Sequence, residues 1–144
     1  LALAGAGEDE PALRAHAAEL GVADRVQFLG QVSHDLLPRL LSAADVVVLP
    51  SEREGLANVW VEALACGTPL VIPDIGGARE VVRRDTAGRI VPRHPRSIAA
   101  AVGAILADPP SQEDVAANAA RFSWQANAAE LVGIWREAAE NGPR

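Results

Sequence analysis

The segment that decides the fold is Pro50-Ser-Glu-Arg-Glu54-Gly-Leu-Ala-Asn-Val-Trp-Val-Glu62-Ala-Leu-Ala-Cys-Gly-Thr-Pro69, which directly follows the apolar run Val46-Val-Val-Leu49. Successive apolar residues of this kind predict a strand covered on both faces, as in a parallel sheet between layers of helices. The quoted segment then predicts a turn at Gly55, a helix from about Ala57 to Cys66, and a stop at Gly67. A strand, a turn and a helix in this order are typical of an α/β fold.

Similar alternations of apolar runs and helical segments extend on both sides of this stretch. The expected strands are Leu1 to Ala4, Val26 to Leu29, Val46 to Leu49, Leu70 to Ile72 and Arg89 to Val91. The expected helices run from Pro11 to the residue before Gly21, from Ser33 as cap to Ala44, from Ala57 to Cys66, from Ala78 to Arg83, from Arg96 to Leu106 and from Gln125 to Ala139. We therefore expect a Rossmann-like parallel sheet flanked by helices over residues 1–108, and a helical tail of the same domain over residues 109–144, after the break at Pro109-Pro110.

The quoted segment also carries the strongest indication of a binding site. Ligands of open α/β sheets bind outside the carboxyl ends of the strands, and the first N–H groups of a helix there suit a diphosphate. Gly55 permits close backbone approach, and Glu54 and Glu62 offer carboxylates that accept hydrogen bonds from sugar and ribose hydroxyls. Alternatively, Glu54 only complements the helix dipole and Glu62 is a solvated residue. A carboxylate between Val61 and Ala63 needs a partner, which favours binding.

The residues from Glu54 to Pro69 resemble the E-x7-E signature of glycosyltransferase family 4. Members of that family have the GT-B fold, two Rossmann-like domains with the donor site between them, and this chain resembles the C-terminal domain. Further matching segments are Leu3-Ala-Gly5-Ala-Gly7, Val26-Gln-Phe-Leu-Gly30-Gln-Val, Ala43-Ala-Asp45-Val-Val-Val-Leu-Pro50-Ser51 and Gly76-Gly77-Ala-Arg-Glu80-Val-Val. The likeness runs from Leu1 to about Trp124.

This resemblance implies transfer of a sugar, with retention of configuration, from a nucleoside diphosphate sugar and without a cofactor or metal ion. The catalytic role of contacting the donor sugar's hydroxyls falls on Glu54, and contact with the ribose falls on Glu62. Backbone N–H groups would bind the sugar and phosphates at Gly55, Leu56, Ala57, Asn58 and Val59. The remaining donor contacts would be Gly5 and Gly7, in a loop beside the donor, and Gln31 and Val32, which would meet the base.

In the family, an acceptor domain precedes the segment that matches Leu1, as do one strand of the sheet and an Arg and a Lys that neutralise the diphosphate. We therefore expect an N-terminal acceptor domain as this chain's partner, and no sugar transfer by the chain alone. We also expect that the sheet either has a central gap where the missing strand would lie or has closed over that gap. Many members have an aromatic residue and a Gly in place of Leu56 and Ala57. The sugar, the acceptor and the base, uridine or guanosine, are left open, and synthesis of a bacterial polysaccharide or glycolipid is the expected setting.

The composition excludes some classes of partner. The chain has 144 residues and a net charge of −6, and its thirteen cationic residues are all arginines spread along the chain. Only Arg83 and Arg84 are adjacent, and no basic cluster or stripe is present in the sequence, which argues against binding to nucleic acid. No apolar run approaches the roughly 20 residues that span a bilayer, and the single cysteine, Cys66, cannot form an internal disulfide. We expect a cytoplasmic protein with no membrane contact from this segment.

Other residues carry weaker signals. Gly76-Gly77 predicts either a second backbone approach to the ligand or a plain surface turn ahead of Arg79 and Glu80. We expect solvated side chains at His16, His34 and His94. We expect packing residues at Cys66, Trp60, Trp124 and Trp135, the last on one helix face with Leu131 and Ile134.

Two other functions fit parts of the pattern. A sugar-nucleotide epimerase can share the two-domain architecture, and a non-enzymatic regulatory module can share the α/β fold. A receiver-like module needs an acidic cluster at the strand ends, whereas Asp45 stands at a strand start and Asp74 is isolated in the sequence. The donor-binding function is therefore the leading hypothesis.

Overall fold

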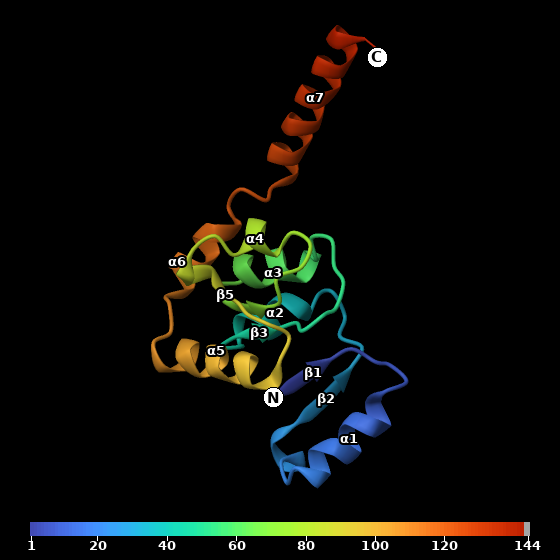
Figure 1. The fold of residues 1–144 in the computed structure, drawn as a ribbon, viewed down its shortest axis with the longest axis vertical. Helices are drawn as coiled ribbons and strands as arrows, with labels where there is room; N and C mark the ends of the chain where they lie inside the picture. The colour runs from blue at the N-terminus through green and yellow to red at the C-terminus, as the bar shows by residue number, and fades with distance from the viewer. Residues whose placement is uncertain (143–144) are drawn as a thin grey trace. The chain divides into compact units, whose positions relative to one another are not determined.

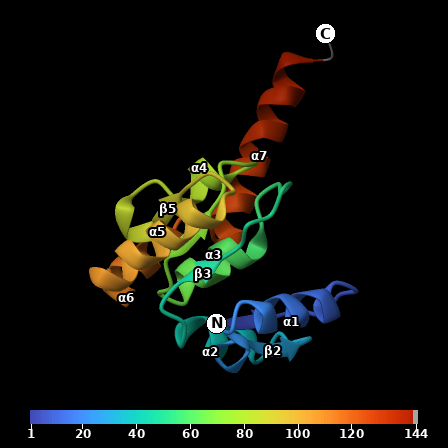
Figure 2. The ribbon, with the colours of Figure 1, turned by 60° about the horizontal axis from the view of Figure 1, so that its bottom comes forward.

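Two parallel strands joined by a helix make up the N-terminal part of the chain in the computed structural model, which describes residues 1–142. Strand β1 spans Ala2–Ala4, helix α1 spans Glu10–Glu19 and strand β2 spans Gln27–Gly30. Helix α1 lies alongside the two strands (Figure 2), and the Arg14 guanidinium lies 4.1 Å from the centre of the Phe28 ring. With the 3₁₀ helix η1, Ala23–Arg25, these elements form the first of the two units into which the chain divides, Leu1–Arg39.

The second unit, from Leu40 onward, is built on a three-stranded parallel sheet. Its strands, in spatial order, are β3 (Val47–Val48), β4 (Leu70–Ile72) and β5 (Gly88–Ile90). Helix α5, Pro95–Ala107, packs Ala101 and Ile105 against Val71 on one face of this sheet. Helix α3, Asn58–Ala65, contacts the central strand from the opposite face (Figure 1). All three residues of β4 are buried, as in a strand covered on both faces.

The expected α/β class with parallel strands and flanking helices is confirmed, and each strand matches its expected run to within one residue at either end. The five strands form two sheets, however. Over residues 1–142, β2 pairs with β1 and β3 pairs with β4, and no strand pairing joins the two sheets. Of the two expected arrangements, a sheet with a central gap and a sheet closed over it, the described residues show the interrupted one.

The remaining helical segments include one whose start differs from the prediction. They are α2 (Leu37–Ser42), α4 (Ala78–Val81), η2 (Asp85–Ala87), α6 (Gln112–Ala116), η3 (Ala117–Ala119) and α7 (Trp124–Asn141). The expected start of α2 at Ser33 is wrong, because a helix from there would place Pro38 beyond its first turn, where the proline ring clashes with the carbonyl four residues earlier. A start at Leu37 keeps Pro38 in the first turn, where proline is tolerated. Helix α4 also ends early, at Val81 rather than Arg83.

The segment after Pro109-Pro110 contains a helix that was not expected, α6. Its cap is Ser111, whose Oγ accepts a hydrogen bond from the Asp114 N–H at 3.1 Å and donates one to Asp114 Oδ2 at 2.6 Å. The Val115 side chain is fully buried, and α6 and η3 contact α3. A serine followed three residues later by a carboxylate is a helix-start signal, so the sequence did contain the information.

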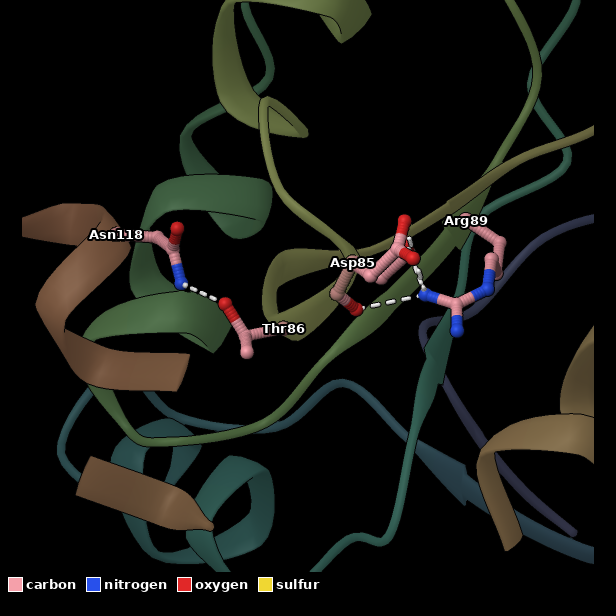
Figure 3. A network of polar contacts seen from close by, with 5 residues as sticks. Asp85, Thr86, Arg89 and Asn118 are labelled. Carbon is pink, nitrogen blue, oxygen red and sulfur yellow. Dashed lines mark hydrogen bonds and ion pairs between the residues drawn. The ribbon is translucent and has the colours of Figure 1, made fainter. Parts of the chain in front are cut away.

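A polar network connects η2 to this C-terminal segment (Figure 3). Asn118 Nδ2 donates hydrogen bonds to Thr86 Oγ1 at 3.1 Å and to the Asp114 carbonyl at 2.8 Å. Arg89 Nη1 donates to the carbonyl of Asp85 at 2.7 Å. These bonds hold the connection that leads into β5.

The three tryptophans have different environments. Trp60 on α3 is fully buried, which confirms its expected packing role, whereas Trp124 and Trp135 are 88% and 66% exposed. The expected packing of those two is therefore wrong, because no residue of α7 is buried. Cys66, expected as a buried small residue, is only half-buried. The three histidines are exposed, as expected.

Candidate functional site

The loop that leads from β3 into α3, residues 50–57, precedes an uncapped helix start. The N-cap residue is Ala57, whose backbone is extended and whose side chain makes no capping hydrogen bond. The first turn of α3 contains no acidic residue. The N–H groups of Asn58 and Val59 and the positive end of the helix dipole therefore lack a compensating side chain from the cap, which suits an anionic ligand.

The two predicted carboxylates flank this helix start. Glu54 lies in the 50–57 loop and Glu62 in the second turn of α3, and both are half-buried. Within the part of the chain that the structure describes, neither carboxylate forms an ion pair. Glu54 does not cap α3, since Ala57 holds the cap position. Half-buried carboxylates that form no ion pair with residues 1–142 are suited to accept hydrogen bonds from ligand hydroxyls.

The other residues predicted around this helix start are accessible. Gly55, Leu56 and Asn58 are exposed, and Ala57 and Val59 are half-buried. The Leu56 side chain is 40% exposed. A Cβ placed on Gly55 would meet no atom within 4 Å, so the structure leaves space beside its backbone.

The predicted residues of the first unit lie together at one edge of its sheet. Gly5 follows β1 and Gln31 follows β2, so both stand at carboxyl ends of parallel strands. The Gly5 N–H donates a hydrogen bond to the Gly30 carbonyl at 2.8 Å, which joins the two loops. Gly5, Gly7 and Gln31 are exposed, and Val32 is half-buried.

An ion pair that the sequence did not reveal closes the turn after β4. Arg79 donates through Nε to Asp74 Oδ1 at 2.8 Å and through Nη2 to Asp74 Oδ2 at 2.6 Å. The hydrogen bonds from Arg79 lower the pKa of Asp74, and those to Asp74 raise the pKa of Arg79. Opposite charges on either side of Gly76-Gly77 were the available signal.

Other types of site find less support in residues 1–142. No group of three or more His, Cys, Asp or Glu side chains is arranged to hold a metal ion there. Asp74 is engaged by Arg79 and Asp45 is exposed, so these two residues do not form the acidic cluster of a receiver-like module. No helix in the same range is both long and apolar enough to cross a membrane.

Comparison with known proteins gives the family. The model described as glycosyl transferases group 1 matches residues 1–122. An uncharacterized glycosyltransferase of Methanocaldococcus jannaschii is 37% identical over 146 residues, which cover 97% of this chain and 37% of that protein. The D-inositol 3-phosphate glycosyltransferase of Thermobispora bispora is 39% identical over 142 residues, which cover 94% of this chain and 33% of that protein. The chain thus spans only 37% and 33% of the lengths of these relatives.

Solved structures agree. Sucrose-phosphate synthase from Thermosynechococcus elongatus superposes with a TM-score of 0.83 at 30% identity, over 99% of this chain and 39% of that one. The HepE protein of Anabaena, solved with UDP-glucose, superposes with a TM-score of 0.71 at 31% identity, over 97% of this chain and 39% of that one. These neighbours are GT-B glycosyltransferases. Sequence family and fold therefore agree, and the chain belongs to the glycosyl transferases of group 1.

Proposed function

We propose that this chain is the donor-binding part of a retaining glycosyltransferase of family 4, which moves a sugar from a nucleoside diphosphate sugar to an acceptor. The observation that carries the proposal is the uncapped start of α3 between two half-buried carboxylates, Glu54 and Glu62, that form no ion pair within residues 1–142. A diphosphate needs positive charge and N–H donors, and the sugars on either side of it need acceptors. These are the groups that the helix start and the two carboxylates offer.

The proposal gives each group one task. The N–H groups of Asn58 and Val59 bind the diphosphate at the positive end of α3. Glu54 contacts the hydroxyls of the donor sugar, and its negative charge stabilises the positive charge that develops at the anomeric carbon. Glu62 accepts hydrogen bonds from the ribose. The backbone of Gly55, Leu56 and Ala57 supplies the remaining contacts to sugar and phosphate.

The first unit contributes by resemblance to the family. Its proposed donor contacts are Gly5, Gly7, Gln31 and Val32. A structural neighbour solved with UDP-glucose supports a nucleotide sugar as the ligand class. The proposal includes no metal ion or other cofactor. It assigns the diphosphate charge to the start of α3 and to an Arg and a Lys that, by the family resemblance, precede the segment matching Leu1. Its setting is the synthesis of a polysaccharide or glycolipid in the bacterial cytoplasm.

The substitution Glu54→Ala in the full-length protein tests this function. We expect turnover to fall and the affinity for the nucleoside diphosphate sugar to fall, while the affinity for the plain diphosphate stays nearly unchanged, because Glu54 faces the sugar. Calorimetry with both ligands, together with turnover measurements, gives the comparison. Glu52→Ala is the matched control, because Glu52 is an exposed carboxylate of the same loop that pairs with Arg93 at 3.3 Å.

Other outcomes would change the assignment. If Glu54 only complements the helix dipole, its removal lowers stability by about 0.3–1 kcal/mol and leaves sugar binding intact. If the affinities for both ligands fall equally, or if turnover stays close to that of the unmodified protein, Glu54 does not contact the sugar. Conversion of the donor to its epimer, in place of a new glycosidic linkage, would indicate an epimerase.

A further inference from the structure

We propose that the turn of residues 74–79 is a positioning element that fixes the backbone of Glu54 and Gly55, and through it the selectivity for the sugar of the donor. This inference rests on the proposed function, in which Glu54 contacts that sugar. It concerns residues that touch the 50–57 loop rather than the ligand. The evidence is a direct backbone contact between the 74–79 turn and the 50–57 loop.

The contact is made by two consecutive glycines. The Gly77 N–H donates a hydrogen bond to the Gly55 carbonyl at 2.7 Å. Gly76 has a φ of +46°, a left-handed conformation that favours glycine, and a Cβ placed on it would overlap the carbonyl oxygens of both Glu54 and Gly55. A side chain at position 76 therefore cannot be accommodated without displacing the backbone of the proposed sugar contact.

Gly77 is in a less restricted position. A Cβ there would lie 2.8 Å from Leu56 Cδ1 and 3.3 Å from Leu56 Cβ. The nearest atom is the end of a flexible side chain, and the Leu56 side chain is partly exposed, so it has room to move. We therefore expect Gly77→Ala to disturb the loop less than Gly76→Ala does.

The ion pair between Asp74 and Arg79 spans the two glycines and joins the two ends of the turn through a two-point contact. Both side chains are exposed, so the pair contributes modestly and is weakened by salt. It restricts the turn, while the close approach at Gly76 sets the position of the loop.

The position of this loop matters because a displacement of about 1 Å at a reacting centre can reduce the rate by about a hundredfold. Moving the carbonyls of Glu54 and Gly55 moves the Glu54 carboxylate with them. The diphosphate, which the proposal assigns to the N–H groups at the start of α3, depends on a different part of the backbone. Loss of the Gly76 contact should therefore affect the sugar more than the diphosphate.

Gly88 is a control that separates positioning from stability. It also has a positive φ, +133°, and a Cβ on it would overlap backbone atoms of Leu70 in the neighbouring strand. It thus has the same steric problem as Gly76, but its neighbours belong to β4 and not to the 50–57 loop. Gly103, in α5, has open space around its Cβ and is the neutral control.

The test compares Gly76→Ala, Gly77→Ala, Gly88→Ala and Gly103→Ala in the full-length protein. Amide hydrogen exchange of residues 54–58 and of the Gly77 N–H is measured without ligand, at a temperature where each variant is folded. We expect exchange there to speed up by about tenfold or more in Gly76→Ala, by less in Gly77→Ala, and not in the two controls. Unchanged exchange in both Gly76→Ala and Gly77→Ala would overturn the positioning role.

The second measurement compares two dissociation constants, one for a sugar-bearing donor and one for the corresponding plain diphosphate, and takes their ratio. The donor is UDP-glucose or GDP-mannose, and KM and kcat are measured for the same donor. We expect Gly76→Ala to weaken binding of the sugar-bearing ligand about tenfold more than binding of the diphosphate, and to lower kcat. Both effects result from displacement of Glu54. Gly88→Ala should lower the melting temperature and leave the ratio unchanged. Equal changes of the ratio in Gly76→Ala and Gly88→Ala would overturn the inference, since both would then act through stability alone. Faster amide exchange in residues 54–58 with an unchanged ratio of dissociation constants would support the contact between the 74–79 turn and the 50–57 loop. It would count against the proposed contact of Glu54 with the sugar.

Discussion

Helices α3 and α7 both carry tryptophan and aliphatic residues at helical spacing, yet only α3 buries them. Trp60, Ala63 and Leu64 of α3 are fully buried. On α7, Leu131, Ile134 and Trp135 remain between 42% and 66% exposed. The difference shows that an amphipathic sequence fixes the face of a helix but not what covers it. Helix α3 is covered because it lies between β4 and the α6–η3 segment.

The largest expected effect is the loss of stability on removal of the buried ring of α3. Trp60→Ala should lower the free energy of unfolding by about 3–5 kcal/mol, because it leaves a cavity in the core. Urea unfolding followed by circular dichroism measures the change. Trp60→Phe is the control, since Trp60 Nε1 is buried and has no hydrogen-bond partner among residues 1–142, so its removal breaks no bond there. That substitution should cost less than about 1.5 kcal/mol. Similar losses for both variants would mean that the volume of the ring is not what matters.

The next prediction distinguishes a carboxylate that contacts the ligand from one that only changes the net charge of the protein. Glu62→Ala should weaken the binding of nucleoside diphosphates by about 1.5–3 kcal/mol, whether or not they carry a sugar, because the proposed partner of Glu62 is the ribose. Calorimetry with the full-length protein measures both affinities. Glu137→Ala, an exposed carboxylate on α7, is the matched control and should leave them unchanged. Unaltered affinity of the Glu62 variant for the plain diphosphate would rule out the ribose contact.

A smaller effect is expected on α7. Trp135→Ala should change the free energy of unfolding by no more than about 0.5 kcal/mol, because the side chain is mostly exposed. The same urea titration as for Trp60 gives the value. A loss above about 2 kcal/mol would show that the face of α7 is covered in the full-length protein.

The smallest effect belongs to the exposed pair of Asp74 and Arg79. Because the folded-state pKa of Asp74 is lowered, the stability that the pair contributes is present above the unfolded pKa of about 3.8 and is lost as the pH falls through the folded pKa. The difference in stability between the unmodified protein and Asp74→Asn should therefore be detectable near pH 6 and disappear at pH values well below 3.8. It should also shrink in high salt. A difference that does not depend on pH would contradict the assignment.

Much of this architecture could be predicted from the sequence, because each strand is a short apolar run and each match to the family is local. The helix start at Leu37 is also indicated by the sequence, because Pro38 is tolerated in the first turn of a helix that begins there but not in a helix capped by Ser33. The close approach of Gly76 to Glu54 could not. It depends on how a turn after β4 meets a loop after β3, and no spacing along the chain encodes that distance.

In the candidate site, too, some features could be predicted from the sequence and others depend on tertiary packing. The residue types and spacing of Glu54 and Glu62 pointed to a ligand, since carboxylates beside a helix start suit hydroxyls next to a diphosphate. Their half-buried state, without an ion pair among residues 1–142, could come only from the fold. The burial of Trp60 and the exposure of Trp135 likewise depend on tertiary packing.

The unequal burial of the three tryptophans gives the protein a built-in optical reporter. Indole emission shifts to shorter wavelength in an apolar environment, so Trp60 should emit to the blue of Trp124 and Trp135, which are exposed to water. Replacing the two exposed tryptophans with phenylalanine would leave one fluorophore, located on the same helix as Glu62. Its intensity and anisotropy would then report directly on events at α3, with no dye attached.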